Sequence, residues 1–485
     1  MTDHDLAFTP AWRQAELIAD RKVSPVELVR LYLDRIERID PTVHAFITVA
    51  ADQAIEEARQ AEAQVMLGGS LAPLHGVPVS LKDIESTRGI RTTMGSLVFK
   101  DTVPDRDSVV AERVRAAGAI IVGKTNTPEI AIHLETVTDN LLVGACRNPW
   151  DLTRTTGGSS GGAAAALATG LCALAVGSDG GGSIRIPASF CGVFGFKPSQ
   201  GMVPRAGGLG RPDPNQFSQS GPMSNDVRDA AVLLTALAGP DPRDPQPYLR
   251  DRSSGFVEDI ERPLGGLRIG WSPDFGYGAV DPEVERTALA AARTFEGLGC
   301  HVEAATVSLR PGLSDHFWNV FGSNAYLQYG HLLEEHRDLL GESARIALER
   351  GKAIPGHQYA KSLRAVNELK LYMDGVMERY DLLLTPTTSI TAFDPANRPT
   401  QIGGKRIDSI TGFYPYTFPI NMTGQPAATV PCGFVEGLPV GLHIIGKFRG
   451  DALVLRAAAA FERARPWNGR RPSILGAVQS AKPDR

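Results

Sequence analysis

Three side chains of types that can move protons and acyl groups stand in or beside glycine-rich sequence. Ser183 follows Gly180-Gly181-Gly182, Ser159 lies 24 positions earlier (183 − 159) between two glycine pairs, and Lys82 ends the alternating stretch 77–82. Glycine allows other groups to approach the backbone closely. A run of glycines can also direct several N–H groups at one oxygen, as acyl transfer requires. The pattern favours a hydroxyl nucleophile, Ser183, in a glycine-lined loop.

Two other interpretations of the glycine clusters are weaker. Flexible linkers are often rich in glycine and serine, but these clusters are short and are bounded by the apolar stretches 163–168 and 171–176. Phosphate-binding loops follow set patterns, and neither G-x-x-x-x-G-K-[ST] nor a G-x-G-x-x-G between strand and helix is present. We therefore expect no nucleotide cofactor.

A third alternative makes Ser159 the nucleophile. Gly157-Gly158-Ser159-Ser160-Gly161 matches the G-x-S-x-G nucleophile elbow, which must follow a buried strand. The preceding residues 148–154 do not form a strand pattern, whereas an apolar run precedes Ser183. Lys82 is ambiguous on its own, because a lysine at a strand end is usually a solvated surface residue.

The elements that must position these residues alternate between strands and helices, which predicts an α/β fold. Ser24-Pro25-Val26-Glu27 is a capping box that opens the first long helix. The other expected helices are 52–66, 107–117, 226–237, 281–298, most of 312–380 and 451–463. The expected strands are 77–83, 119–122, 267–271, 301–304, 382–384, 429–430 and 440–445. Residues 386–406 are expected to form a loop, and the segment after Ser160 to be helical and then extended.

Composition excludes several classes of protein. The chain has 485 residues, 42% of them hydrophobic, and a net charge of −4. Such a charge gives no long-range attraction to nucleic acid or anionic lipid. We expect no nucleic-acid or membrane partner, no secretory signal and no transmembrane helix. Five scattered cysteines indicate reduced thiols and a cytoplasmic location, and no metal-ligand spacing is present, so we expect no metal and no cofactor.

The run from Arg154 to Gln200 resembles the signature sequence of the amidase signature family, serine hydrolases with a Ser–cis-Ser–Lys triad. Other stretches that fit the family are Gly76–Asp83, Gly123–Glu129, Arg147–Trp150, Gly192–Pro198, Asn421–Pro426 and Leu438–Ile445. The resemblance implies one domain, 1–485, built on a large mixed twisted β-sheet with helices on both faces. It further implies a helical N-terminal part (1–70), a signature core (155–200) and a mostly helical insertion lining the substrate side (310–380).

The resemblance also implies a set of catalytic roles. Ser183 would attack the carbonyl carbon, Ser159 would relay the proton and Lys82 would be the base, with a cis peptide bond at Ser159. Lys82 must then be uncharged, and burial would lower its pKa from the usual value of about 10.4. The backbone N–H groups of Gly180, Gly181, Gly182 and Ser183 would form the oxyanion hole.

Supporting and pocket residues complete the expected site. Ser160 and Asp179 are predicted hydrogen-bond partners behind the reacting groups, and Arg185 is predicted to pair with a carboxylate. Segments 130–145, 310–330 and 405–420 are expected to shape the substrate pocket, although aromatic residues more often belong to a core. Their candidate pocket residues are Leu134, Phe317, Trp318, Phe321, Phe413, Tyr414 and Tyr416.

These observations together predict an amidase that hydrolyses the C–N bond of a small-molecule carboxamide, and also esters or carbamates, as a homodimer. One alternative is the glutaminase (A) subunit of a tRNA-dependent amidotransferase. The stretch Thr411–Thr417 offers aromatic residues but no acidic residue for the α-amino group of glutamine, which disfavours that alternative. Another is a catalytically inactive binding relative, which retention of Lys82, Ser159 and Ser183 together disfavours.

Overall fold

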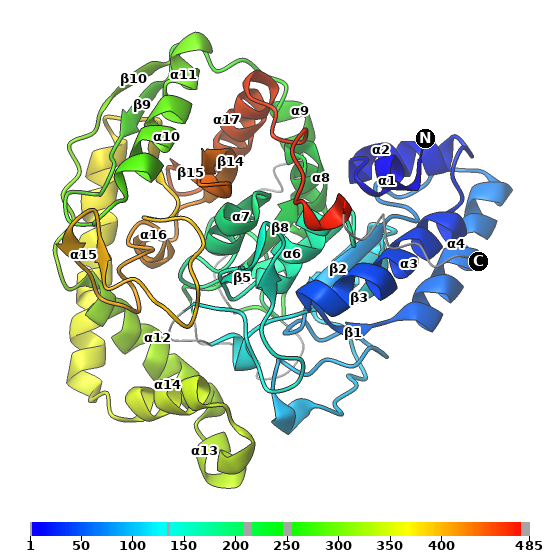
Figure 1. Cartoon of the computed structure of the whole chain (residues 1–485), viewed down its shortest axis with the longest axis horizontal. Helices are drawn as coiled ribbons and strands as arrows, with labels where there is room; N and C mark the ends of the chain where they lie inside the picture. The colour runs from blue at the N-terminus through cyan, green and yellow to red at the C-terminus, as the bar shows by residue number, and fades with distance from the viewer. Residues whose placement is uncertain (1, 133–135, 207–215, 246–254, 477–485) are drawn as a thin grey trace.

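The fold is α/β and is built on one mixed sheet of 11 strands (Figure 1). The computed structural model describes residues 2–132, 136–206, 216–245 and 255–476. The strands lie in the order β1-β3-β2-β6-β8-β7-β14-β15-β11-β9-β10. Their bounds are β1 Phe46–Val49, β2 Pro78–Lys82, β3 Ile120–Thr125, β6 Leu174–Asp179, β7 Phe194–Lys197, β8 Gln219–Ser224, β9 Arg268–Trp271, β10 His301–Ala304, β11 Leu382–Pro386, β14 Ala427–Val435 and β15 Leu438–Gly446.

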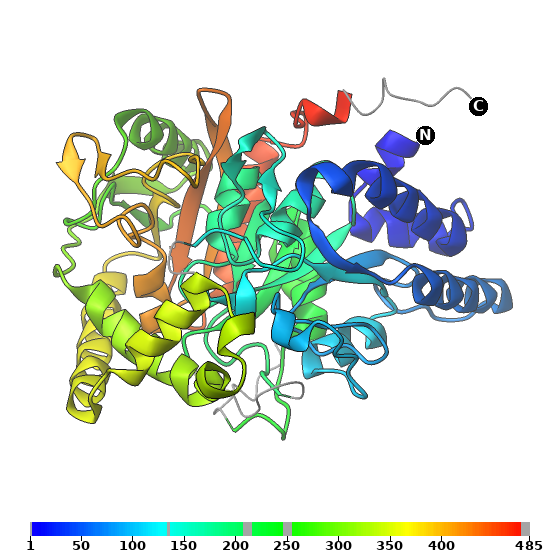
Figure 2. The same ribbon diagram turned by 60° about the horizontal axis from the view of Figure 1, so that its bottom comes forward.

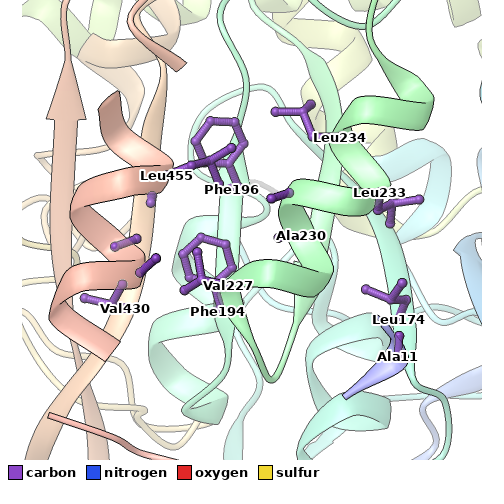
Figure 3. Packing of buried hydrophobic residues seen from close by; sticks show 14 of the residues in the cluster. Ala11, Leu174, Phe194, Phe196, Val227, Ala230, Leu233, Leu234, Val430 and Leu455 are labelled. Atoms are coloured by element: carbon purple, nitrogen blue, oxygen red, sulfur yellow. The ribbon is translucent and has the colours of Figure 1, made fainter. Parts of the chain in front are cut away.

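Alternation along the strands divides the core between the two faces of the sheet. Side chains two residues apart point to the same face, so Leu174 and Val176 of β6 join one hydrophobic cluster and Ala175 joins another. Helices α8 (Val227–Leu237) and α17 (Asp451–Ala464) cover the first face. Figure 3 shows Phe194 and Phe196 of β7 packed against these two helices.

The second face carries two separate groups of helices. Near its centre lie α6 (Gly161–Thr169), which is rich in small residues, and α7 (Arg185–Cys191), and both are fully buried. Toward β11 lie α12 (Leu313–Tyr329), α15 (Gly356–Met377) and α16 (Phe418–Thr423), which share a second cluster. The candidate catalytic residues lie between these two groups.

Peripheral helices lie at the β1 end of the sheet and beyond the α12–α15 group (Figures 1 and 2). At the β1 end, α1 (Asp3–Ala7), α2 (Ala11–Ala19), α3 (Pro25–Val43) and α4 (Ala51–Leu67) surround the strand edge. The predicted capping box at Ser24 is present at the start of α3. Beyond the α12–α15 group, α13 (Leu332–Glu335) and α14 (Glu342–Lys352) pack against Met94, Ile130 and Ile132, which adjoin β2 and β3 in the sequence.

Several elements differ from the sequence-based expectation. Strand β8 separates β6 from β7 and runs antiparallel to both, although its sequence Gln-Ser-Gly-Pro-Met-Ser carries no strand pattern. The helix expected over 281–298 is divided into α10 (Pro282–Ala292) and α11 (Thr294–Gly297). The expected loop 386–406 contains the short pair β12 (Gln401–Ile402) and β13 (Lys405–Arg406). Within the described part of the chain, no helix combines the length and apolar character needed to cross a bilayer.

Candidate active site

Lys82 lies at the carboxyl end of β2, where β2 runs parallel to both neighbours, β3 and β6. Val79 and Leu81 point into the first-face core, so alternation directs Lys82 to the second face. Its side chain is completely buried. Its Nζ donates to Ser159 Oγ at 2.6 Å and to Ser178 Oγ at 3.0 Å. The amine is therefore held between two hydroxyls.

Burial makes this amine a usable base near neutral pH. Removal from water disfavours the ammonium form and lowers the pKa of Lys82 to about 7, against the opposing influence of the Asp179 and Glu85 carboxylates. No carboxylate contacts Nζ directly among the described residues, so nothing adjacent holds the proton on it. About half of the amine is then neutral at pH 7.

Ser159 stands in the loop that joins β5 (Asp151–Thr155) to α6. The peptide bond between Gly158 and Ser159 is cis, as the family resemblance implies. The expectation that residues 148–154 form no strand was wrong, because β5 lies there. It is short and partly exposed, and among the described strands it pairs with β4 (Arg147–Asn148) alone and stays outside the large sheet. The context that a nucleophile elbow requires is absent at Ser159.

Ser160 connects the two serine loops. Its N–H donates to the carbonyl of Ser183 at 3.1 Å. Its hydroxyl donates to the carbonyl of Ser178 at 3.1 Å and accepts from the N–H of the same residue at 3.2 Å. These bonds fix the Ser159 loop against both β6 and the Ser183 loop.

Asp179 organises the loop that carries Ser183. Its carboxylate accepts from Arg185 Nε and Nη2, both at 2.9 Å, and both side chains are fully buried. The predicted pairing of Arg185 with a carboxylate is thus present, in the bidentate form that suits a guanidinium. Burial alone would raise the pKa of Asp179, but Arg185 holds it well below its usual range.

Three of the four predicted oxyanion donors are free to bind a ligand. The N–H groups of Gly180, Gly181 and Ser183 donate to no other described residue, and all three residues line one cavity. The prediction is wrong for Gly182, because its N–H donates to Asp179 Oδ1 at 2.8 Å and is not available to an oxyanion. It lies outside the cavity lining, because the loop turns there with a φ of +131°. A glycine run does not reveal which of its N–H groups a neighbouring carboxylate binds.

The structure brings Lys82 and Ser159 into direct contact and places Ser183 beside them. Ser159, Ser178 and Ser183 line the same cavity. Within the described residues, no hydrogen bond joins the hydroxyls of Ser159 and Ser183. Catalytic hydrogen bonds are often long before substrate binds. A hydrogen bond between the Ser159 and Ser183 hydroxyls can therefore still form when a substrate is bound.

The cavity that these residues share is small and is lined by both polar and apolar groups. Its volume is about 130 Å³, and Phe317, Phe321 and Tyr414 line it as predicted. Trp318 joins them, whereas Leu134 falls outside the described residues. The remaining lining residues are Ile84, Met94, Ile130, Ala131, Ile132, Thr136, Arg205, Ser218, Ala325, Gln328 and Tyr329.

Two of the predicted pocket aromatics lie elsewhere. Tyr416 is fully buried, and its hydroxyl donates to the carbonyl of Ala279 at 3.1 Å and accepts from Ser389 Oγ at 3.2 Å. Its ring packs edge-on against Phe275, away from the cavity. Phe413 packs against Phe393 in the same core. The sequence places these aromatics in the right segment but cannot show which way each ring points.

Aromatic packing also explains a glycine in the loop that carries Ser183. A Cβ at Gly181 would lie 2.9 Å from Cζ of Phe317, closer than two carbons tolerate. Phe317 is itself packed between Phe321 and Phe418, with ring centroids 5.4 and 5.5 Å away. The aromatic wall therefore lies directly against the backbone that would hold the oxyanion.

Sequence reasoning missed several residues of the site. Ser178 contacts the amine of Lys82, and although it lies inside the run Arg154–Gln200 it was not predicted as a site residue. Asn421 Nδ2 donates to Asp179 Oδ1 at 2.8 Å, and Thr417 Oγ1 donates to the carbonyl of Gly181 at 2.7 Å. Both come from a segment more than 200 residues away, and only the family resemblance of Asn421–Pro426 could have indicated it. Among the described residues, no cluster of His, Cys, Asp or Glu is arranged to hold a metal ion.

Comparison with known proteins gives one consistent family. The sequence pattern of the Amidase family matches residues 27–455. An acylamidase from Rhodococcus erythropolis is 36% identical over 478 residues, covering 98% of this chain and 99% of the relative. The A subunit of the glutamyl-tRNA(Gln) amidotransferase from Moorella thermoacetica is 36% identical over 501 residues, covering 97% and 99%. The solved structure of a bacterial aryl acylamidase of the amidase signature family superimposes with a TM-score of 0.88 at 32% identity, covering 98% of this chain and 99% of that one.

Proposed function

Because this chain belongs to the amidase signature family and is an amide hydrolase, we propose that it hydrolyses small carboxamides through an acyl-enzyme on Ser183. The observation that carries this assignment is the buried amine of Lys82, 2.6 Å from Ser159 Oγ, beside a cavity that Ser183 also lines. An uncharged amine in that position can accept a proton through one hydroxyl from the other.

The proposed reaction has two halves. Ser183 Oγ attacks the carbonyl carbon, its proton passes to Ser159, and the Ser159 proton passes to Lys82. The N–H groups of Gly180, Gly181 and Ser183 stabilise the oxyanion. The C–N bond then breaks as Lys82 returns a proton through Ser159 to the leaving nitrogen. In the second half, water attacks the acyl-enzyme by the same relay and releases the carboxylic acid.

The cavity suggests which amides fit. Its volume of about 130 Å³ is close to the ~150 Å³ of an engineered apolar cavity that holds benzene. We therefore propose a substrate with one apolar group about the size of a single ring beside the scissile carbonyl. Esters and carbamates of the same shape are proposed as secondary substrates.

A panel of anilides, primary amides, esters, carbamates and glutamine tests the activity. We expect turnover of neutral amides with one ring-sized apolar group. Ser183→Ala should abolish turnover, and Lys82→Ala should reduce it by several orders of magnitude. A serine-directed fluorophosphonate should label Ser183 in the wild type. Labelling at Ser159 instead, or near-normal hydrolysis by Lys82→Ala, would contradict the assignment.

The amidotransferase relatives give a second candidate function, the glutaminase component of a larger complex. A glutamine site needs a partner for the α-amino group, and the described cavity lining contains no carboxylate. The lack of a carboxylate in the described lining favours hydrolysis of small carboxamides over hydrolysis of glutamine. Ammonia release from glutamine, together with co-purification of partner proteins, would reverse that preference. A cytoplasmic homodimer remains our proposal for its state in the cell, testable by fractionation and by size-exclusion chromatography.

A further inference from the structure

One peptide unit of the nucleophile loop is held at both of its ends. The carbonyl of Gly181 accepts from Thr417 Oγ1 at 2.7 Å, and the N–H of Gly182 donates to Asp179 Oδ1 at 2.8 Å. These two groups belong to the same planar peptide unit and point in opposite directions across it. Two bonds on opposite edges therefore fix the rotation of the plane about its long axis.

This unit needs such support because the sequence around it supplies none. Gly180, Gly181 and Gly182 lack the side chains that restrict backbone rotation, so many orientations are open to them. Gly182 adopts a φ of +131°, a value that residues with a side chain rarely take. A Cβ there would also collide with the Thr417 hydroxyl. The observed orientation is thus selected by its neighbours.

The orientation of this unit decides where its two neighbours point. The preceding peptide carries the N–H of Gly181, and the following peptide carries the N–H of Ser183. Both N–H groups donate to no other described residue and border the cavity. A rotation of the central unit changes the torsion angles that aim them. Donors act on an oxyanion only when they lie about 2.7–3.1 Å from it, so a small rotation reduces their effect.

Thr417 is itself firmly placed. It is fully buried at the start of α16, and its own carbonyl accepts from Arg185 Nη2 at 3.0 Å. Four residues further, Asn421 donates to both the side chain and the backbone carbonyl of Asp179. Thr417 and Asp179 are therefore joined through Arg185 and Asn421 into one buried network.

We propose that Thr417 is a positioning residue of the reaction: its hydroxyl sets the orientation of the Gly181–Gly182 peptide and so aligns the N–H groups of Gly181 and Ser183 on the oxyanion. The proposal rests on the acyl-transfer function assigned to Ser183. A second acceptor, the carbonyl of Tyr414 at 3.3 Å, lies within reach of the same hydroxyl and is the longer contact.

The test compares variants that keep and remove this one donor. Thr417→Val preserves shape and loses the hydroxyl, whereas Thr417→Ser keeps the hydroxyl and loses a methyl group. The matched control is Thr423→Val, because Thr423 is a buried threonine near the end of the same helix that donates to the helix carbonyl of Ile420 at 3.3 Å. Each variant is assayed for kcat and KM on the best amide of the panel, for inhibition by a trifluoromethyl ketone, for fluorophosphonate labelling rate and for melting temperature.

Thr417→Val should lower kcat by about tenfold to a hundredfold, less than the 10²–10³ lost with a direct donor, with KM within about twofold. Affinity for the trifluoromethyl ketone, whose adduct carries an oxyanion, should fall by the same factor as kcat/KM. Thr417→Ser should restore kcat to within about threefold of wild type, and Thr423→Val should match wild type. If valine prevents folding, Thr417→Cys against Thr417→Ser makes the same comparison, because a thiol is a weak donor.

Three results would overturn the proposal: an unchanged kcat in Thr417→Val, equal losses in the valine and serine variants, or a loss confined to KM or to melting temperature. Fluorophosphonate labelling separates this failure from failure of the proposed function. A wild-type enzyme that is not labelled at Ser183 refutes the function itself. A labelled wild type with an equally labelled Thr417→Val refutes only the role of Thr417.

Discussion

The rate of hydrolysis should rise with pH and level off near pH 7, because the base must be uncharged. Burial lowers the pKa of Lys82 from 10.5 to about 7. The lower pKa corresponds to roughly 5 kcal/mol in favour of the neutral form. An exposed lysine would be neutral in only about one molecule in three thousand at pH 7, against about half for Lys82. Burial therefore contributes about three orders of magnitude to the active fraction.

The assay is kcat/KM between pH 5 and 9, with the labelling rate of Ser183 as a second readout that needs no substrate. Below pH 7 both should fall about tenfold for each unit, since protonation of one group removes the base. Glu85→Gln sharpens the test. The Glu85 carboxylate is buried, accepts from the hydroxyls of Ser108 and Ser220, and raises the pKa of Lys82.

Replacing that carboxylate by an amide of the same shape should move the rising limb to lower pH, because the ammonium form loses a favourable charge interaction. A profile that is flat from pH 5 to 8, or that falls as pH rises through this range, would refute the reasoning. So would a limb that moves to higher pH in Glu85→Gln.

Three further predictions concern the loop and its surroundings. Gly181→Ala should lower kcat by about 10²–10³, because the new Cβ meets the Phe317 ring at 2.9 Å and shifts a donor; wild-type kinetics would contradict this. Arg185→Met should destabilise the fold by about 3–5 kcal/mol in urea unfolding, since it strands the buried Asp179 carboxylate, and adding Asp179→Asn should recover part of the loss. Tyr416→Phe should lower the free energy of unfolding by about 1 kcal/mol, because the hydrogen bond to Ala279 is lost. KM should stay unchanged. A changed KM would indicate that Tyr416 lines the substrate pocket after all.

The sequence predicted the parts of the site that are local motifs. Lys82 follows an alternating strand, Ser159 and Ser183 lie in glycine clusters, and these patterns are visible without any long-range information. Arg185 was expected to pair with a carboxylate, and Asp179 is six residues away. Most strands and helices were predicted for the same reason, because periodicity is a property of neighbouring residues.

What the sequence could not predict depends on contacts between distant segments. Strand β8 has no β-branched residue and becomes a strand because β6 and β7 provide hydrogen-bond partners on both sides. The N–H of Gly182 looks like that of Gly181 in the sequence, and only the folded loop turns it to Asp179. The sequence around Thr417 carries no signal of its role, because its contact with the carbonyl of Gly181 forms only when the chain folds.

The insertion of β8 between β6 and β7 also bears on when a newly made chain could become active. Ser183 lies in the crossover from β6 to β7, and those two strands meet only through residues 219–224. The loop also depends on α16, which begins at residue 418. A ribosome that has released the first 200 residues has therefore made Lys82, Ser159 and Ser183, together with Asp179 and Arg185, but neither β8 nor α16. Domains fold as units during synthesis. We therefore expect hydrolytic activity only after the ribosome has made α16, which directly precedes the last two strands, β14 and β15.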